Sequence, residues 1–223
     1  MIHEHHVPVP RTARYFTLGD PSPLAEAWFV CHGYGQLATY FIRHFEPLAN
    51  GGRLIVAPEA LARFYLEDPE GGHANARVGA SWMTREDRLV EIEDYVAYLN
   101  TVYRTVLGSA EPAGVRVVAL GFSQGVATAC RWIARGAVRA DRLILWAGTP
   151  PPDLDLAAAA PVLRRLDLAL VAGTRDRWVT DASLGEQQER LAQHGIPCRV
   201  LRFEGGHELD AGVLASLAAA TSS

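Results

Sequence analysis

The sequence of 223 residues contains no lysine, so arginine supplies all 21 of its basic side chains. This absence excludes every chemistry that needs an amine side chain, including a Schiff-base nucleophile, a Ser–Lys dyad and a P-loop lysine. The formal net charge of −4 offers no basic surface to nucleic acid or to an anionic membrane. We therefore expect no nucleic-acid partner.

Cysteines and long apolar runs are also scarce. Cys31, Cys130 and Cys198 are the only cysteines, and none of them has CxxC spacing, which argues against a disulfide framework or a zinc knuckle. No apolar run is long enough to span a bilayer, and residues 1–14 lack the apolar core of a signal peptide. We expect a cytoplasmic protein without a membrane span or a metal. The sequence leaves open whether it forms a homodimer.

What the sequence does contain is an alternation of apolar, β-rich runs with helical patterns, which predicts an α/β fold. The inner runs are apolar almost throughout, as in strands of a parallel sheet that is covered on both faces. We expect one domain over 1–223, with a mostly parallel, twisted sheet of seven or eight strands. The first one or two strands are expected to be antiparallel. The predicted strands are 13–18, 26–32, 53–57, 115–121, 141–147, 167–173 and 198–203, with a further edge strand at 4–9. The predicted helices are 38–48, 86–107, 124–135, 181–194 and 209–220.

The segment Gly121-Phe122-Ser123-Gln124-Gly125 fits the pattern G-x-S-x-G. An apolar strand leads into it and an amphipathic helical pattern follows, which is the context of a nucleophile elbow. Such an elbow holds its serine in a strained backbone conformation, and side chains at either glycine would clash with the neighbouring chain. We predict that Ser123 is a nucleophile. The alternative is a tight strand-to-helix turn with a capping serine.

A serine hydroxyl needs a base to take its proton, and in hydrolases with this elbow the order is Ser, Asp or Glu, then His. His207 follows the last predicted strand, whereas His194 falls late in a predicted helix. Asp176 follows the strand before that, where its carboxylate could accept a hydrogen bond from the histidine and fix its tautomer. Asp181 is a competing acid, but its position suits the N-cap of the next helix. We therefore predict His207 as base and Asp176 as its partner.

A tetrahedral intermediate also requires hydrogen-bond donors for its oxyanion. One donor in such hydrolases is the backbone N–H of the residue after the nucleophile, here Gln124, and the other comes from the loop after an early strand. The segment His32-Gly33-Tyr34-Gly35 follows such a strand, so we predict the Tyr34 N–H as the second donor. The ring of His32 is expected to brace the turn.

These segments resemble the phospholipase/carboxylesterase family of α/β-hydrolases, which includes acyl-protein thioesterases and small bacterial carboxylesterases. The resemblance spans about residues 26–220 and rests on the HGYG, GFSQG, GTRD and GGHE segments. It implies an esterase that needs no cofactor, has no large lid, and acts on small carboxylic or thiol esters. The chain departs from the family at Gln36, where an Asp is common, and at Val126, where a second Gly is common.

The natural substrate is not specified by the sequence. The long connection 58–85 contains four large side chains that either line an acyl pocket or pack the connection onto the body of the protein. These are Phe64, Tyr65, Trp82 and Met83. Alternative functions are a small serine peptidase, a lipase or a perhydrolase on the same scaffold, and a catalytically silent ligand-binding relative.

Overall fold

The computed structural model describes residues 1–67, 75–108 and 114–220. A seven-stranded sheet runs through it with the strand order β1-β3-β2-β6-β7-β8-β9. The strands are β1 (Tyr15–Leu18), β2 (Glu26–Cys31), β3 (Arg53–Pro58), β6 (Arg116–Phe122), β7 (Arg142–Trp146), β8 (Asp167–Gly173) and β9 (Arg199–Phe203). Only β1 is antiparallel to its neighbour. The predicted parallel sheet is therefore confirmed, and antiparallel pairing applies to the first strand alone.

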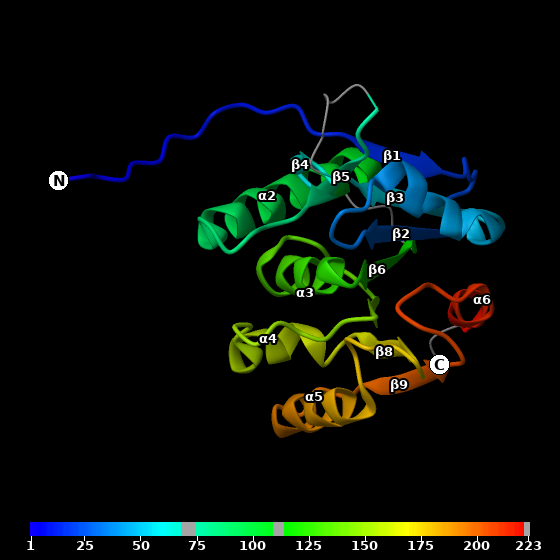
Figure 1. Ribbon diagram of the computed structural model, residues 1–223. Helices are drawn as coiled ribbons and strands as arrows, with labels where there is room; N and C mark the ends of the chain where they lie inside the picture. The colour runs from blue at the N-terminus through cyan, green and yellow to red at the C-terminus, as the bar shows by residue number, and fades with distance from the viewer. Residues whose placement is uncertain (68–74, 109–113, 221–223) are drawn as a thin grey trace.

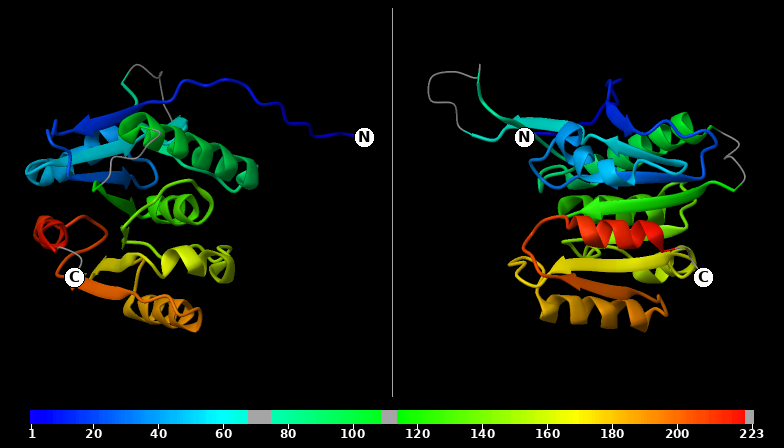
Figure 2. Two further views of the ribbon diagram at one scale, coloured as in Figure 1. Left: turned by 180° about the vertical axis from the view of Figure 1, so that it is seen from behind. Right: turned by 90° about the vertical axis from the view of Figure 1, so that its right-hand side faces the viewer.

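Helices cover both faces of this sheet (Figure 1). One face carries α2 (Arg88–Leu107), α3 (Gln124–Arg135), α4 (Leu156–Leu163) and α5 (Asp181–Gln193). The other face carries α1 (Ala38–Phe41), the 3₁₀ helix η1 (Ile42–Leu48) and α6 (Ala211–Ala219), as both views of Figure 2 show from the side and from behind. Each face has its own hydrophobic cluster, because the alternate side chains of every strand point to opposite sides.

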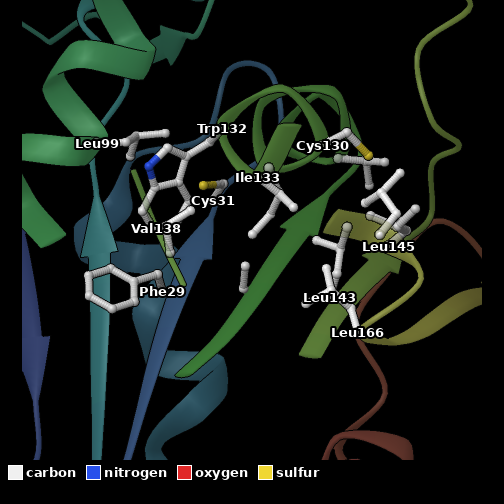
Figure 3. Close-up of a cluster of buried hydrophobic side chains, with 14 of the residues drawn as sticks. Phe29, Cys31, Leu99, Cys130, Trp132, Ile133, Val138, Leu143, Leu145 and Leu166 are labelled. Atoms are coloured by element: carbon white, nitrogen blue, oxygen red, sulfur yellow. The ribbon is translucent and has the colours of Figure 1, made fainter. Parts of the chain in front are cut away.

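The larger cluster fills the space between the sheet and α2–α5, and Figure 3 shows the part of it beneath α3. Trp132 and Ile133 on α3 face the strand residues Phe29 and Leu143, and Leu99 on α2 closes the cluster from the side. All five side chains are buried. This packing fixes α3 against the sheet, and α3 starts directly after Ser123.

Several predicted boundaries were wrong. Residues 4–9 form no strand, and the long helix starts at Arg88 with a left-handed Asp87 as its N-cap. The segment 38–48 divides into α1 and η1, and Pro47, which has no N–H to donate, lies inside η1. The N-cap of α5 is Thr180, whose hydroxyl accepts the Ser183 N–H, so the expectation of an Asp181 cap was also wrong.

Two elements were not predicted. The first is the hairpin of β4 (Ala62–Tyr65) and β5 (Val78–Ser81), which forms a separate two-stranded sheet within the long connection 58–85. Residues 68–74 of that connection lie outside the described residues. The second is α4, which lies between β7 and β8 and is the only helix or strand there, so no lid domain interrupts the sheet.

Candidate active site

Ser123 stands at the sharp turn between β6 and α3. Its backbone has φ 54° and ψ −117°, a conformation that L residues rarely adopt. Its side chain makes no capping hydrogen bond to α3, although it occupies the N-cap position. The hydroxyl is therefore not used to cap the helix, which removes the alternative explanation of the motif.

The glycines of the motif are required by space, as predicted. A Cβ atom at Gly121 would lie 2.3 Å from the carbonyl oxygen of Gly125. A Cβ atom at Gly125 would lie 2.2 Å from the carbonyl oxygen of Cys31 and 2.7 Å from that of His32. These clashes are with backbone and cannot be relieved by a rotamer change. The second of them also shows that the elbow touches the end of β2.

His207 joins the two other predicted side chains. Its Nε2 atom lies 2.9 Å from the Oγ atom of Ser123, and its Nδ1 atom lies 2.9 Å from Oδ2 of Asp176. An ionised carboxylate can only accept, so the proton sits on Nδ1 and the Nε2 lone pair faces the serine hydroxyl. A histidine held in this tautomer can take the hydroxyl proton.

Asp176 is held in place by its own turn. Its side chain is fully buried, and Oδ1 accepts the backbone N–H groups of Trp178 at 2.8 Å and Val179 at 3.2 Å. This leaves Oδ2 for the imidazole. Asp181, the competing acid, instead pairs with Arg202 at 2.9 Å.

The acid turn and the histidine loop are tied together by backbone contacts. The N–H of Thr174 donates to the carbonyl of Phe203, and the N–H of Arg175 donates to that of Gly205, both at 2.8 Å. A Cβ at Gly173 would lie 2.3 Å from the Gly205 carbonyl oxygen, so this close approach needs a glycine. The indole N–H of Trp146 donates to the carbonyl of Glu208 at 2.8 Å and anchors the far side of the loop.

The two predicted oxyanion donors lie in the loop after β2 and at the start of α3. Within the described parts of the chain, the backbone N–H groups of Tyr34 and Gln124 have no hydrogen-bond acceptor. In the Tyr34 loop, the Gly33 N–H instead donates to Oε1 of Gln36 at 2.8 Å, and the Gln36 N–H donates to the carbonyl of Gly33. Gln36 thus supplies a side-chain oxygen to this loop, although the residue differs from the Asp of the resemblance.

His32 braces this loop from beneath, as expected. It is completely buried; its Nε2 accepts the Ala60 N–H at 3.0 Å, and its Nδ1 donates to the carbonyl of Gly33 at 2.8 Å. Burial lowers the pKa of the imidazole, although the Gly33 carbonyl and the nearby Glu59 act in the opposite direction. His32 is therefore a neutral, structural histidine.

The four large side chains that were expected either to line a pocket or to pack the long connection lie in different surroundings. Phe64 and Tyr65 lie on the β4–β5 hairpin, and the ring of Phe64 is 5.1 Å from that of Tyr34. Met83 is half-buried. Trp82 is 2% exposed and packs against His32 and Tyr95, so we assign it to the core instead of to a substrate pocket.

Sequence reasoning missed two polar clusters near the site. The amide of Gln124 hydrogen-bonds to Ser81 at the end of β5 and to the two residues that follow it. The buried carboxylate of Glu59, at the end of β3, hydrogen-bonds to Arg14 at 2.6 Å and to Arg63 at 2.7 Å. Burial alone would raise the pKa of Glu59, but these hydrogen bonds outweigh burial and hold the pKa below its usual range. Arg63 is only four residues from Glu59, but Arg14 and Gln124 are each more than 40 residues from their partners, so the residue type was the only signal for those contacts.

The described residues contain one group with the spacing of metal ligands, formed by the exposed side chains of Glu4, His6 and Asp87. None of these residues belongs to the Ser123 site. No helix in the described parts of the chain has the length and apolar character needed to cross a membrane.

The protein matches known proteins in its three-dimensional structure and not in its sequence. No family model and no curated protein sequence matches the chain. The structure resembles Zea mays acyl-protein thioesterase 2, with a TM-score of 0.68 and 18% identity over 93% of this chain and 96% of that one. It also resembles esterase PE8, with a TM-score of 0.65 and 21% identity over 94% and 97% of the two chains. The Mesorhizobium loti carboxylesterase gives a TM-score of 0.65 and 18% identity over 93% and 95%. The chain therefore has the α/β-hydrolase fold, in the form found in these thioesterase and carboxylesterase structures.

Proposed function

We propose that the protein is a serine hydrolase that cleaves carboxylic esters or thioesters through an acyl-enzyme intermediate. The observation that carries this proposal is the continuous hydrogen-bonded path from Ser123 through His207 to Asp176, with 2.9 Å at each step. Catalytically silent binding would not require this path.

In the first half of the reaction, the Oγ atom of Ser123 attacks the substrate carbonyl carbon while His207 Nε2 takes its proton. The negative charge that develops on the carbonyl oxygen would be stabilised by the N–H groups of Tyr34 and Gln124, which have no other acceptor within the described residues. Collapse of the tetrahedral intermediate expels the alcohol or thiol, which receives the proton from His207.

In the second half, water replaces the leaving group. His207 takes a proton from the water, whose oxygen attacks the acyl carbon, and returns the proton to Ser123 Oγ as the acid leaves. The carboxylate of Asp176 accepts the Nδ1–H of His207 and stabilises the imidazolium, while two backbone N–H groups hold the carboxylate in place. No step requires a cofactor.

The resemblance to thioesterase and carboxylesterase structures supports this chemistry, and the absence of a lid domain between β7 and β8 supports an open site. The test is labelling with a fluorophosphonate probe, followed by assays with nitrophenyl esters of increasing chain length and with matched thioesters. We expect one probe per chain, attached to Ser123 and absent from Ser123→Ala. An unlabelled wild-type protein without turnover would refute the proposal. Labelling without turnover of either ester class would favour a peptidase.

A further inference from the structure

The end of β5 and the two residues after it contact both segments that carry the proposed oxyanion donors. On one side, the Gly35 N–H donates to the carbonyl of Ala80 at 2.9 Å, and the Ala80 N–H donates to the carbonyl of Gln36 at 3.2 Å. This pair of bonds attaches the strand to the two residues that directly follow Tyr34. The contact is close, because a Cβ at Gly79 would lie 2.4 Å from the Gly35 carbonyl oxygen.

On the other side, the same segment binds the side chain of Gln124. Oε1 of Gln124 accepts the backbone N–H of Trp82 at 3.1 Å, and Nε2 donates to the carbonyl of Met83 at 2.9 Å and to Oγ of Ser81 at 3.1 Å. Ser81 Oγ in turn donates to the Met83 carbonyl at 2.8 Å. Both amide hydrogens and the amide oxygen are thus used. Because these hydrogen bonds hold the side chain of Gln124, they also hold its backbone N–H, which is one of the proposed oxyanion donors.

The indole of Trp82 adds a third attachment. Its Nε1–H donates to the carbonyl of His32 at 2.8 Å, and its ring lies 5.1 Å from the imidazole of His32. The carbonyl of His32 lies in the peptide that leads into Gly33, just before Tyr34. Trp82 is 2% exposed, so this hydrogen bond is made in the core and is not in competition with water.

We propose that residues 80–83, named here the oxyanion brace, set the distance between the two oxyanion donors, and that the side chains of Gln124 and Trp82 are its positioning residues. The proposal rests on the proposed function, because it concerns the same site. The two donors belong to segments far apart in the chain, the loop after β2 and the start of α3. A donor pair must hold its geometry to within about 0.5 Å to act on one oxygen. The brace supplies a common support for both.

This assignment explains why a long, polar glutamine follows the nucleophile. The backbone N–H that serves as donor is available from any residue except proline, so the donor role alone does not select glutamine. Only a side chain with an acceptor and two donors, of this length, matches the Trp82 N–H, the Met83 carbonyl and the Ser81 hydroxyl together.

The test compares three variants with the wild type. Gln124→Met keeps the length of the side chain and removes its hydrogen bonds. Trp82→Phe keeps a ring against His32 and removes the indole N–H. Trp132→Phe is the matched control, because Trp132 is also completely buried and its indole N–H donates to Asn100 at 3.0 Å, between α3 and α2. Each preparation is titrated with a fluorophosphonate, so that rates are expressed per labelled serine.

Loss of a whole oxyanion donor lowers kcat by about 100- to 1,000-fold. A donor that is displaced but still present should therefore lower kcat by a smaller factor. We expect kcat to fall about 10- to 100-fold in Gln124→Met and about 10-fold in Trp82→Phe, with KM changed by less than about threefold. The Ki of a trifluoromethyl ketone, which forms a tetrahedral adduct with Ser123, should rise by the same factor as kcat/KM falls. Trp132→Phe should lower the thermal midpoint without changing kcat or this Ki.

The proposal is overturned if Gln124→Met and Trp82→Phe turn over at the wild-type rate per labelled serine, or if Trp132→Phe loses as much activity as they do. It is also overturned if KM rises and kcat does not change, since that result would assign both residues to substrate binding. These outcomes are distinct from failure of the proposed function, which would appear as a wild-type protein that is neither labelled nor active.

Discussion

Asp176 accepts the Nδ1–H of His207 through one carboxylate oxygen at 2.9 Å and two backbone N–H groups through the other. The carboxylate thus has two separate tasks: it orients the imidazole, and it closes the turn that follows β8. The two tasks can be separated by substitution, because an asparagine keeps an acceptor oxygen for the turn and presents an amide group to the histidine.

We therefore predict that Asp176→Asn retains its fold and loses most of its activity. The amide N–H₂ would face Nδ1, stabilise the tautomer with its proton on Nε2, and so remove the base that faces Ser123. In serine proteases that use this triad, the same exchange lowers kcat about 10⁴-fold, and we expect a loss of about 10³- to 10⁴-fold here. Ester kinetics would measure it, with the thermal midpoint as the measure of folding. A variant that is nearly as active as the wild type would contradict the assignment of Asp176.

The second prediction concerns the glycines of the elbow. Gly121→Ala and Gly125→Ala each place a methyl group within 2.3 Å of a backbone carbonyl oxygen, so the turn must open or the strands must shift. Overpacking of a core typically lowers the free energy of unfolding by about 1–3 kcal/mol. We expect losses at or above the upper end of this range, because the added methyl groups meet rigid backbone. Urea unfolding would measure the loss of stability.

The matched control is Gly185→Ala in α5. A Cβ at that position meets nothing within 4 Å, and its φ is not in the left-handed region. Alanine should stabilise the helix by about 0.5–1 kcal/mol. If all three alanine variants had the same stability, the steric explanation of the G-x-S-x-G pattern would be wrong.

The parallel strands and the Ser123, Asp176 and His207 geometry could be expected from the sequence, because their signals are local. Buried strands appear as apolar runs, and each candidate residue lies within four residues after the end of such a run. The prediction of a strand at 4–9 was wrong, because alternating polar and apolar residues also occur in segments that do not pair with a neighbouring strand. The hairpin was missed because its eight strand residues include Gly79 and two alanines, and its stability comes from contacts with Gly35 and Gln36 that local patterns do not contain.

Polar contacts across the fold could not be predicted at all. Gln124 was expected to act through its backbone, and the sequence gives no indication that its amide binds residues 81–83. Trp82 was expected either to line a pocket or to pack the long connection onto the body, and the structure buries it directly after β5, against His32. Positions in a loop are poor guides to burial when the loop contains an unrecognised strand.

The third prediction concerns alkaline pH. Burial raises the pKa of the Cys31 thiol and of the Cys130 thiol to about 12, from an ordinary value of 9.0. The unfolded chain therefore releases these protons at lower pH than the folded chain does. The stability that the two thiols confer is fully present below pH 9.0 and is lost as pH rises towards about 12, by about 1.4 kcal/mol per pH unit for each thiol.

Urea unfolding between pH 8 and about pH 11 would measure this slope. Cys31→Ala and Cys130→Ala should each make the slope shallower, whatever they do to the stability at neutral pH. Alkylation gives a second readout, because iodoacetamide should modify the half-buried Cys198 in the folded protein and reach Cys31 and Cys130 only after unfolding. Rapid labelling of Cys31 in the folded state would contradict the burial that this prediction uses.

The fourth prediction is the acid counterpart and concerns His32. Burial lowers the pKa of this imidazole below its ordinary value of 6.5, despite the opposing effect of the Gly33 carbonyl and Glu59. Below pH 6.5 the unfolded chain binds a proton at His32 that the folded chain does not, so stability must fall as pH decreases. The slope that this one group contributes is at most about 1.4 kcal/mol per pH unit.

Other groups also titrate in this range, so the contribution of His32 must be obtained as a difference between variants. Glutamine at position 32 can offer an acceptor to the Ala60 N–H and has no proton to gain, so His32→Gln should flatten the acid side of the stability profile while lowering stability at pH 7. His194→Gln, which alters a half-buried histidine at the end of α5, serves as the comparison. Parallel acid profiles for the wild type and His32→Gln would mean that the imidazole is charged in the folded state. A charged ring could not accept the Ala60 N–H, and the support that His32 gives to the Tyr34 loop would then need a different explanation.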